Sequence, residues 1–286
     1  MDTLSTLPPV LSHFQITPIL AARKKGSLTA ITSTDLGLTE VEVRLEPGGV
    51  VLPDGARLTW DVLEEIAANP LGCYSIEEGA PQMVRGFSEL SGLYYSLMPT
   101  PSAPTMLISG LPMHRIKDTD PYEDTLTKIR AVSPVRGRVL DTATGLGYTA
   151  IHAARTASQV VTIEIDPQAQ EIARRNPWSQ ALFGDPKITR LIADSYDEIE
   201  SFPAESFASI IHDPPTLRLA GDLYSAEFYF RAFRVLKPDG RMFHYIGDPR
   251  SKSGASVTKG VVRRLKQAGF TRVLPRPEAF GVVAYK

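Results

Sequence analysis

The sequence is poor in cysteine, in long apolar runs and in net charge, and each shortage excludes a class of protein. Cys73 is the only cysteine among 286 residues, so an intramolecular disulfide, a cysteine-based zinc site and an iron–sulfur cluster are excluded. We therefore expect a reducing, cytoplasmic compartment and assign no metal site. No apolar run reaches the roughly 18–20 residues that span a bilayer, and the N-terminus lacks the features of a signal peptide, so we expect no membrane partner. A formal net charge of −1 excludes a strongly basic nucleic-acid coat protein.

The charge balance and the pattern of strand and helix signals both change near residue 120. Residues 1–120 carry 8 basic and 14 acidic side chains, whereas residues 121–286 carry 23 basic and 18 acidic ones. The first part has short alternating segments, including a strand pattern at 39–45, an Asp54-Gly55 hairpin signal and a short helix at 61–68. The second part alternates strand and helix patterns, which favours a parallel sheet covered on both faces. We predict a β-rich N-terminal domain at residues 1–105 and an α/β domain at residues 106–286.

A glycine-containing turn joins the first strand of the second part to a helix. Gly145 and Gly147 can adopt positive φ and let a ligand approach the backbone closely. Glu164 ends the next strand, where a carboxylate can accept the hydroxyls of a ribose. A tight strand–helix turn without a ligand is the alternative, and the spacing to Glu164 argues against it. Asp166 precedes Pro167 and reads as a helix N-cap.

Two consecutive prolines follow the fourth strand of the second part, in His212-Asp213-Pro214-Pro215. Prolines cannot continue a paired strand, so the chain turns out at the carboxyl edge of the sheet, where open α/β sheets bind ligands. Asp213 is therefore expected to face the reactive end of a cofactor. His212 is either a proton acceptor or a buried, hydrogen-bonded histidine.

The motifs D-x-A-T-G-x-G and E-I-D-P resemble motifs I and II of the class I methyltransferases that depend on S-adenosylmethionine (SAM), over about residues 120–286. The resemblance implies a Rossmann-like, doubly wound, mostly parallel sheet with SAM as methyl donor. It implies that Asp141 lies near the amino-acid end of SAM, that Glu164 binds the ribose and that Asp194 binds the adenine amino group. Ala143 stands where the family often has glycine. The cofactor-binding residues expected from it are Asp141, Ala143, Gly145, Gly147, Tyr148, Glu164, Ile165, Asp194 and Ser195.

The Asp-Pro-Pro segment resembles motif IV of methyltransferases that act on amino nitrogens, which implies that Asp213 and the Pro214 backbone hold the acceptor amine. Together with His212 they form the expected catalytic set. Thr216 replaces the aromatic residue of that motif, so a planar base would lose its stacking partner. Tyr224 or another aromatic of the following helix can supply a ring, or these aromatics are core residues.

The segment from Asp222 to Gly240 resembles the matching segment of spermidine synthases, which share the fold and carry an N-terminal β domain. Aminopropyl transfer from decarboxylated SAM to a polyamine is therefore the alternative function. The glycine-rich, aspartate-containing turn typical of those enzymes is absent here. A binding module that keeps the fold without chemistry is a third reading.

His114 and Arg115 precede motif I, in a segment that often closes over the cofactor in this family. We expect them to contact the SAM carboxylate or the substrate, and pairing of Arg115 with Asp118 or Asp120 is the alternative. Residues 241–276 hold nine basic side chains and one acid, so they form either a phosphate-binding patch or a solvated surface. The acceptor can thus be a small molecule, an RNA or a protein. We expect the N-terminal domain to shape the acceptor pocket or to form a homo-oligomer contact.

Overall fold

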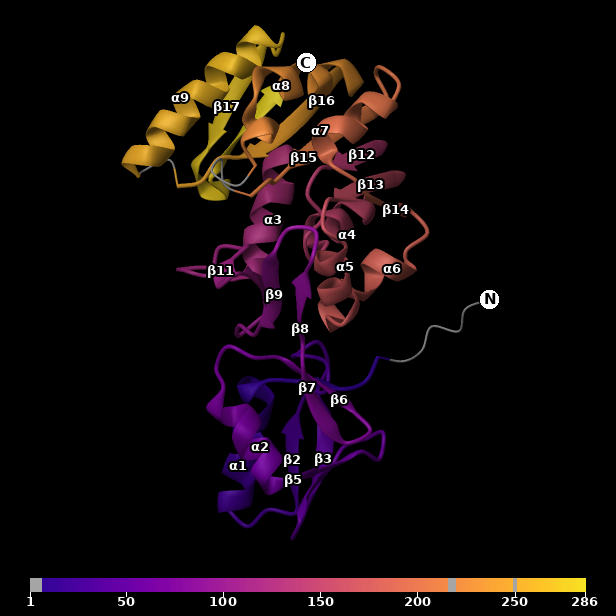
Figure 1. The fold of residues 1–286 in the computed structure, drawn as a ribbon, viewed down its shortest axis with the longest axis vertical. Coiled ribbons are helices and arrows are strands. Elements are labelled where there is room, and N and C mark those ends of the chain that lie inside the picture. The colour runs from indigo at the N-terminus through magenta and orange to yellow at the C-terminus, as the bar shows by residue number, and fades with distance from the viewer. Residues whose placement is uncertain (1–6, 216–219, 249–250) are drawn as a thin grey trace. The chain divides into compact units, whose positions relative to one another are not determined.

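The computed structural model describes residues 7–215, 220–248 and 251–286 (Figure 1). The chain divides into two compact units, one of residues 1–122 with 168–180 and one of residues 123–167 with 181–286. The boundary at residues 105 and 106 remains a prediction. No helix among the described residues has the length and apolarity that crossing a membrane requires.

The first unit is built from small antiparallel sheets; two are formed by consecutive strands, and one pairs β1 with the distant β6. One has the order β2-β3-β4-β5, another β1-β6-β7 and a third β11-β10-β9-β8. The expected hairpin at Asp54-Gly55 is the β4–β5 pair. The strands are β1 (Val10–Leu11), β2 (Thr29–Thr32), β3 (Val41–Glu46), β4 (Gly49–Val51), β5 (Arg57–Thr59), β6 (Tyr74–Glu77), β7 (Ala80–Met83), β8 (Arg85–Ser88), β9 (Leu93–Met98), β10 (Thr105–Ile108) and β11 (Leu111–Pro112), with helices α1 (His13–Lys24) and α2 (Trp60–Ala68).

The second unit contains a seven-stranded sheet in the order β14-β13-β12-β15-β16-β18-β17. All neighbouring pairs are parallel except those of β18, which runs antiparallel to β16 and β17. The expected α/β fold, with a mostly parallel sheet and a smaller β-rich N-terminal region, is confirmed. The strands are β12 (Arg138–Asp141), β13 (Gln159–Glu164), β14 (Ile188–Ile192), β15 (Phe207–His212), β16 (Leu236–Tyr245), β17 (Arg272–Arg276) and β18 (Gly281–Tyr285).

The order of the strands locates the ligand-binding edge of the sheet. β13 and β14 extend from β12 to one side, whereas β15 and β16 extend to the other. The strand order reverses between β12 and β15, and open α/β sheets bind ligands outside the carboxyl ends of the strands at such a point. Asp141 ends β12, and Asp213 directly follows β15, so both lie at this reversal.

The helices of the second unit connect these strands. Asp120 caps α3 by accepting a hydrogen bond from the Tyr122 amide at 2.8 Å. α9 begins at Lys252, with Ser251 as its N-cap. The helices are α3 (Pro121–Val132), α4 (Tyr148–Ala154), α6 (Gln180–Gly184), α7 (Ser195–Glu198), α8 (Ala226–Val235) and α9 (Lys252–Gln267); α5 (Pro167–Arg174) groups largely with the first unit.

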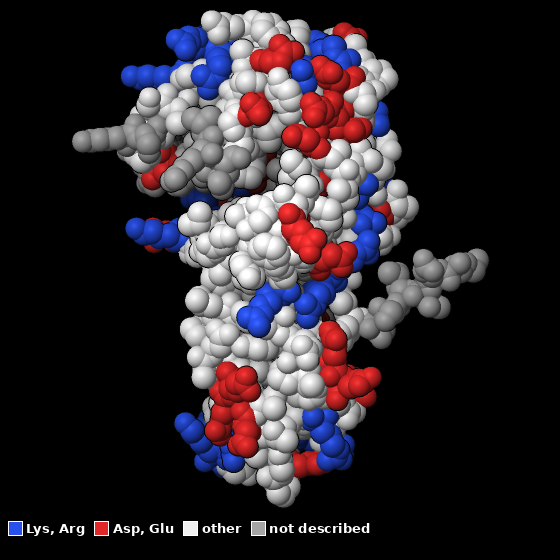
Figure 2. Space-filling model, viewed as in Figure 1, with Lys and Arg blue, Asp and Glu red and all other residues white. Residues whose placement is uncertain are grey.

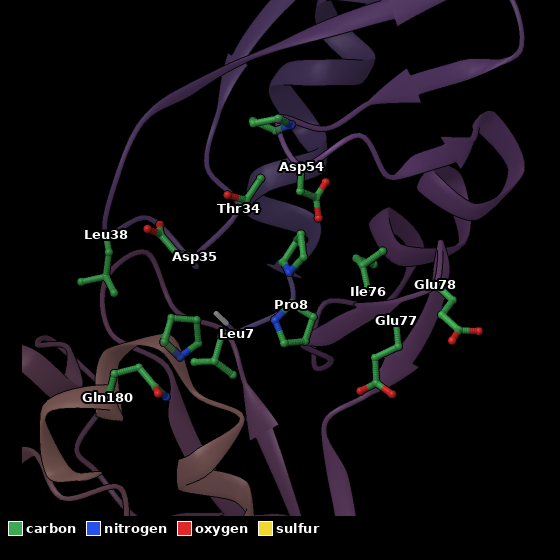
Figure 3. Close-up of a pocket in the computed structure, with 13 residues that line it drawn as sticks. Leu7, Pro8, Thr34, Asp35, Leu38, Asp54, Ile76, Glu77, Glu78 and Gln180 are labelled. Carbon is green, nitrogen blue, oxygen red and sulfur yellow. The ribbon is translucent and has the colours of Figure 1, made fainter. Parts of the chain in front are cut away.

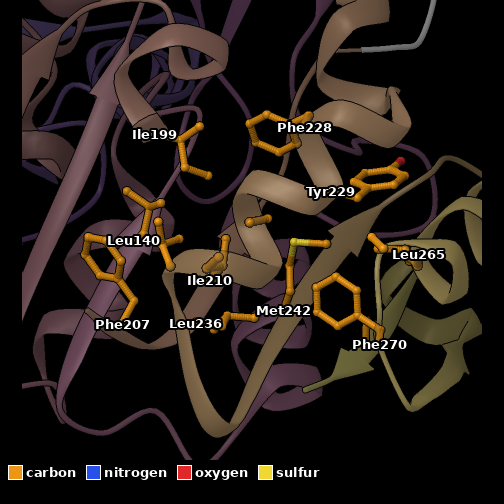
Figure 4. Close-up of a cluster of buried hydrophobic side chains, with 14 of the residues drawn as sticks. Leu140, Ile199, Phe207, Ile210, Phe228, Tyr229, Leu236, Met242, Leu265 and Phe270 are labelled. Carbon is orange, nitrogen blue, oxygen red and sulfur yellow. The ribbon is translucent and has the colours of Figure 1, made fainter. Parts of the chain in front are cut away.

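A large apolar core holds the sheet of the second unit against α8 and α9 (Figure 4). Phe228 and Tyr229 of α8 are fully buried there beside Met242 of β16 and Leu265 of α9. Side chains this deeply buried contribute on the order of 1.5–3 kcal/mol each to folding. This core is the rigid support on which the strand ends present Asp141, Glu164 and Asp213.

Candidate active site at the strand ends

Asp141 is a fully buried carboxyl group at the end of β12. Its Oδ2 accepts a hydrogen bond from Thr162 Oγ1 at 2.6 Å, and its Oδ1 accepts one from Thr149 Oγ1 at 3.1 Å. Burial raises the pKa of Asp141 to about 7, while the two threonine hydroxyls partly oppose that rise. A carboxyl group that changes charge near neutral pH is typical of functional sites.

The raised pKa of Asp141 predicts a pH-dependent stability. Between about pH 4 and pH 7 the folded protein keeps a proton that the unfolded chain has lost, so stability falls as pH rises through this window. The slope is at most about 1.4 kcal/mol per pH unit. Asp141→Asn mimics the protonated carboxyl, so its free energy of unfolding should fall less between pH 4 and pH 8. Denaturant unfolding of both proteins at matched pH tests this, and parallel profiles would contradict it.

Glu164 ties the second strand to the glycine turn. Its Oε2 accepts a hydrogen bond from the Gly145 amide at 2.8 Å, and its Oε1 accepts one from the Asp166 amide at 3.1 Å. Burial raises the pKa of Glu164, and the backbone amides oppose that rise. The carboxylate is therefore fixed beside the turn, and a carboxylate has lone pairs left for ligand hydroxyls.

The two glycines of the turn have different surroundings. Gly145 has a φ of 51°, and a Cβ placed on it would meet no atom within 4 Å. Gly147 has a φ of 78°, and its Cβ would lie 2.6 Å from Leu182 Cδ2. Gly145 thus borders open space, as the backbone beneath a ligand must, whereas Gly147 is needed for packing against α6.

These surroundings predict opposite effects for two matched substitutions. Both alanines suffer the positive φ, which costs about 1–2 kcal/mol, but only Gly147→Ala also collides with Leu182, which adds about 1 kcal/mol or more. Gly145→Ala should unfold at a higher temperature than Gly147→Ala. On the SAM site that the family resemblance implies, it should bind S-adenosylhomocysteine, the demethylated product of SAM, at least about tenfold more weakly than wild type, since about 1.4 kcal/mol of lost contact suffices. Thermal unfolding and calorimetric titration measure the two effects. Unchanged binding by Gly145→Ala would contradict this view of the turn.

Apolar and polar side chains meet at the ends of the outer strands. Ile165 follows β13 and Ile192 ends the neighbouring β14. They are 55% and 50% exposed, so both offer apolar surface against which a flat ring can pack. Asp194 is exposed and caps α7 through the Tyr196 amide at 2.8 Å. Ser195 is buried and donates to the Thr142 carbonyl at 2.7 Å.

Two other expected cofactor residues differ in exposure. Ala143 is partly exposed on the turn. Tyr148 is the first residue of α4 and is 5% exposed, so its ring belongs mainly to the packing beneath the turn. Contact of either residue with a cofactor remains a prediction.

The Asp213 carboxylate forms an ion pair that the motif analysis did not foresee. Lys128 of α3 places its Nζ 2.6 Å from Asp213 Oδ2 and 2.8 Å from Asp124 Oδ2. Lys128 is 2% exposed, and its ammonium lies 4.8 Å from the centre of the Tyr245 ring. Burial raises the pKa of Asp213, and the Lys128 ammonium opposes that rise. The Asp124–Lys128 spacing of four residues is visible in the sequence, but nothing there shows that this face is buried.

His212 does not face the site. Its Nδ1 lies 2.6 Å from Thr142 Oγ1, its Nε2 lies 2.9 Å from the Leu223 carbonyl oxygen, and its ring stacks on Phe228. Burial lowers the pKa of His212 to about 4, so the ring is neutral. Both nitrogens are engaged within the protein, which supports the buried, structural alternative over a proton acceptor.

Tyr224 is a core residue rather than a stacking partner for a substrate. It is 3% exposed, and its hydroxyl donates to the Pro215 carbonyl at 3.1 Å. This hydrogen bond holds the two-proline turn that follows Asp213. Thr216 lies outside the described residues, while Pro214 is buried directly beside Asp213.

His114 and Arg115 lie in the first unit, where His114 Nδ1 is 3.0 Å from Thr105 Oγ1. Their role in the site remains a prediction. The same unit has a pocket of about 850 Å³ (Figure 3). None of the residues that line it is among the cofactor-binding, catalytic or substrate-binding residues expected from the sequence. Asp35 on its rim is already held by Thr39 and Ser33.

Basic residues follow one stripe of α9. Lys259, Arg263 and Lys266 are exposed on this helix, and Figure 2 shows basic side chains gathered over α9 with acidic ones over α7 and α8. Phosphate binding by this stripe remains a prediction, as does a solvated helix surface.

Sequence comparison places these features among known proteins. Residues 124–255 match the family model described as the methyltransferase small domain. The uncharacterized protein MJ1233 of Methanocaldococcus jannaschii is 48% identical over 237 residues, which are 82% of this chain and 80% of that protein. Polyamine aminopropyltransferase 2 of Streptomyces coelicolor is 28% identical over 60% of this chain, and the match spans only 32% of that protein.

Comparison with solved structures supports the fold. The crystal structure of a spermidine synthase in complex with the transition state analogue AdoDATO has a TM-score of 0.58 and 18% sequence identity, covering 74% of this chain and 78% of that one. The resemblance to class I SAM-dependent methyltransferases, with local similarity to spermidine synthases, is confirmed by these matches.

Proposed function

Because the chain belongs to the same family as the uncharacterized protein MJ1233 of Methanocaldococcus jannaschii and carries a methyltransferase small domain, we propose that it is a SAM-dependent methyltransferase acting on an amine nitrogen. The observation that carries the proposal is the juxtaposition of Glu164, the Gly145 backbone and Asp213 along one edge of one sheet. A cytoplasmic location forms part of this proposal.

The chain's residues fit the parts of SAM. Glu164 beside the open face of Gly145 would accept the ribose hydroxyls, and exposed Ile165 and Ile192 would flank the adenine. Asp141 would lie toward the amino-acid end, where its carboxyl group can interact with the donor ammonium. These assignments use residues at the strand ends and in the turns that directly follow them.

When bound, SAM supplies a methyl group that an acceptor nitrogen takes with its lone pair, while the carbon–sulfur bond breaks and sulfur keeps the bonding pair. Asp213 would hold the acceptor through Oδ1, which has no hydrogen-bond partner among the described residues, while Lys128 holds Oδ2. Asp213 accepts an N–H of the amine, orients the lone pair and takes up the proton that the nitrogen loses. Fixed orientation is the main source of rate in such a site.

Aminopropyl transfer from decarboxylated SAM is the second candidate. The partial match to a polyamine aminopropyltransferase and the spermidine synthase fold favour it. It needs the same strand-end site, and it differs in the donor and in the group transferred.

A direct assay separates the candidates. Purified protein is incubated with SAM or with decarboxylated SAM, each with a panel of primary amines that includes putrescine and spermidine, and products are identified by mass spectrometry. We expect a gain of one methyl group with SAM. A gain of an aminopropyl group only would establish the second candidate, and binding of either donor without any product from amines, RNA or protein fractions would favour a binding module.

A further inference from the structure

The buried face of α3 carries charged side chains. Its buried positions are Pro121, Asp124, Thr125, Lys128 and Val132, which recur at helical spacing and so lie on one face of the helix. Charged side chains are almost never fully buried unless they are paired. The partner of Lys128 outside this helix is Asp213, 85 residues further along the chain.

The Lys128 ammonium has a fixed position and a permanent charge. Its Nζ lies 2.6 Å from Asp213 Oδ2, 2.8 Å from Asp124 Oδ2 and 4.8 Å from the centre of the Tyr245 ring. Burial lowers the pKa of Lys128, but the Asp213 and Asp124 carboxylates raise it more, so the side chain stays an ammonium. It therefore meets Asp213 as a fixed cation.

This contact determines which oxygen of Asp213 is left for a ligand. A carboxylate is planar, so an ammonium that holds Oδ2 also fixes the direction of Oδ1, which has no hydrogen-bond partner among the described residues. The backbone on the far side of Asp213 is held as well, because the Tyr224 hydroxyl donates to the Pro215 carbonyl. The carboxylate is thus oriented from its side chain and from the turn that follows it.

The charges around Asp213 act in opposite directions. Burial raises the pKa of Asp213, the Lys128 ammonium lowers it, and the Asp124 carboxylate raises it. Asp141 at the end of β12 is a further acid close enough to interact with Asp213. Tyr224 also faces Asp213, and burial raises its pKa, so its hydroxyl is neutral. Lys128 is the cation among these groups, and the others are acids or neutral.

We propose that Lys128 is a positioning residue for methyl transfer, which keeps Asp213 ionised and turns its Oδ1 toward the acceptor amine. The inference rests on the proposed function and deepens it. An ionised Asp213 can accept an N–H of the amine and then take up the proton that the nitrogen loses, whereas a protonated one cannot take up that proton. Lys128 acts through Asp213 and needs no contact with donor or acceptor.

The two neighbours of Asp213 on α3 predict opposite effects on its titration. The carbon-13 signal of the Asp213 carboxyl group, assigned by its absence in Asp213→Asn, is followed against pH. We expect the midpoint to rise by about one pH unit or more in Lys128→Met, which loses the cation, and to fall in Asp124→Asn, which loses an anion. Lys128→Arg should stay near wild type, as should the control Lys237→Met, which changes an exposed lysine on β16.

A double variant keeps the test decisive if Lys128→Met does not fold. Asp124→Asn/Lys128→Met removes the cation together with the more deeply buried of its two carboxylates. Its midpoint should still rise, by less than in Lys128→Met, because the ammonium that contacts Asp213 directly outweighs the carboxylate behind it. Midpoints within about 0.3 pH unit of wild type in the variants that lack the cation would overturn the inference, as would shifts of Lys128→Met and Asp124→Asn in the same direction.

Methyl transfer from SAM to the amine that the wild type methylates fastest links this titration to the reaction. At the pH of the wild-type midpoint, Lys128→Met should react about fivefold or more slowly, because a one-unit rise leaves roughly a tenth of the carboxyl groups ionised. The rate should recover in part at higher pH, with affinity for S-adenosylhomocysteine unchanged. A rate within about twofold of wild type despite a shifted midpoint would overturn the role of Lys128 and leave the proposed function intact. A wild type that methylates no amine would instead overturn the proposed function itself.

Discussion

Asp213→Ala should lower methyl transfer to the amine by roughly 10²- to 10⁴-fold, the range that a positioned acid–base group contributes. The carboxylate has one oxygen on Lys128 and one without a hydrogen-bond partner among the described residues, so alanine removes the group that we propose orients the amine and takes up its proton. Asp124 still pairs with Lys128 in the variant, so the fold should persist.

A loss of activity without a loss of cofactor affinity distinguishes a role in holding the amine from a role in binding the cofactor. Affinity for S-adenosylhomocysteine should change little, because the ribose and adenine contacts belong to other strand ends. Asp61→Ala, which removes an exposed aspartate from the first turn of α2, is the matched control and should keep wild-type activity. Asp213→Ala that binds product normally and retains activity within threefold would exclude Asp213 as the amine-holding group.

Lys128→Met should be the most destabilising single substitution at the site. It removes the ammonium that contacts two carboxylates whose side chains are 0% and 19% exposed. Breaking a buried ion pair by removing one partner costs about 3–5 kcal/mol, because an uncompensated charge stays buried. Chemical denaturation near neutral pH measures the loss.

The second substitution in that pair should restore much of the loss. Asp124→Asn/Lys128→Met removes the cation together with the more deeply buried of its two carboxylates, so Asp213, whose side chain is 19% exposed, is the carboxylate of this cluster that keeps its charge. The double-mutant cycle should therefore show strong coupling between Asp124 and Lys128. Additive effects of the two substitutions would mean that the pair contributes little, and that Lys128 is held by packing alone.

Most strands and helices of the second unit could be predicted, because alternating apolar runs and caps are local signals. The Asp54-Gly55 hairpin and the strands that precede the glycine turn and end at Glu164 appear where the sequence predicts them. The glycine turn and the Asp-Pro-Pro segment each directly follow a strand. Their position at the same edge of the sheet could therefore be predicted from the sequence.

Burial of polar side chains could not be predicted in the same way. The sequence shows that Asp124 and Lys128 are four residues apart, but a surface helix has the same spacing, and only the packing of α3 makes the pair buried. Likewise, His212 and Tyr224 are compatible with a site or a core, and the contacts with Thr142, Leu223 and Pro215 decide for the core.

A crystal structure of the protein with S-adenosylhomocysteine tests the central claim most directly. We predict the ribose hydroxyls on the Glu164 carboxylate, the ligand passing over Gly145, and the sulfur turned toward Asp213. A nucleoside bound at any other place, or no binding at concentrations that saturate known methyltransferases, would contradict the account.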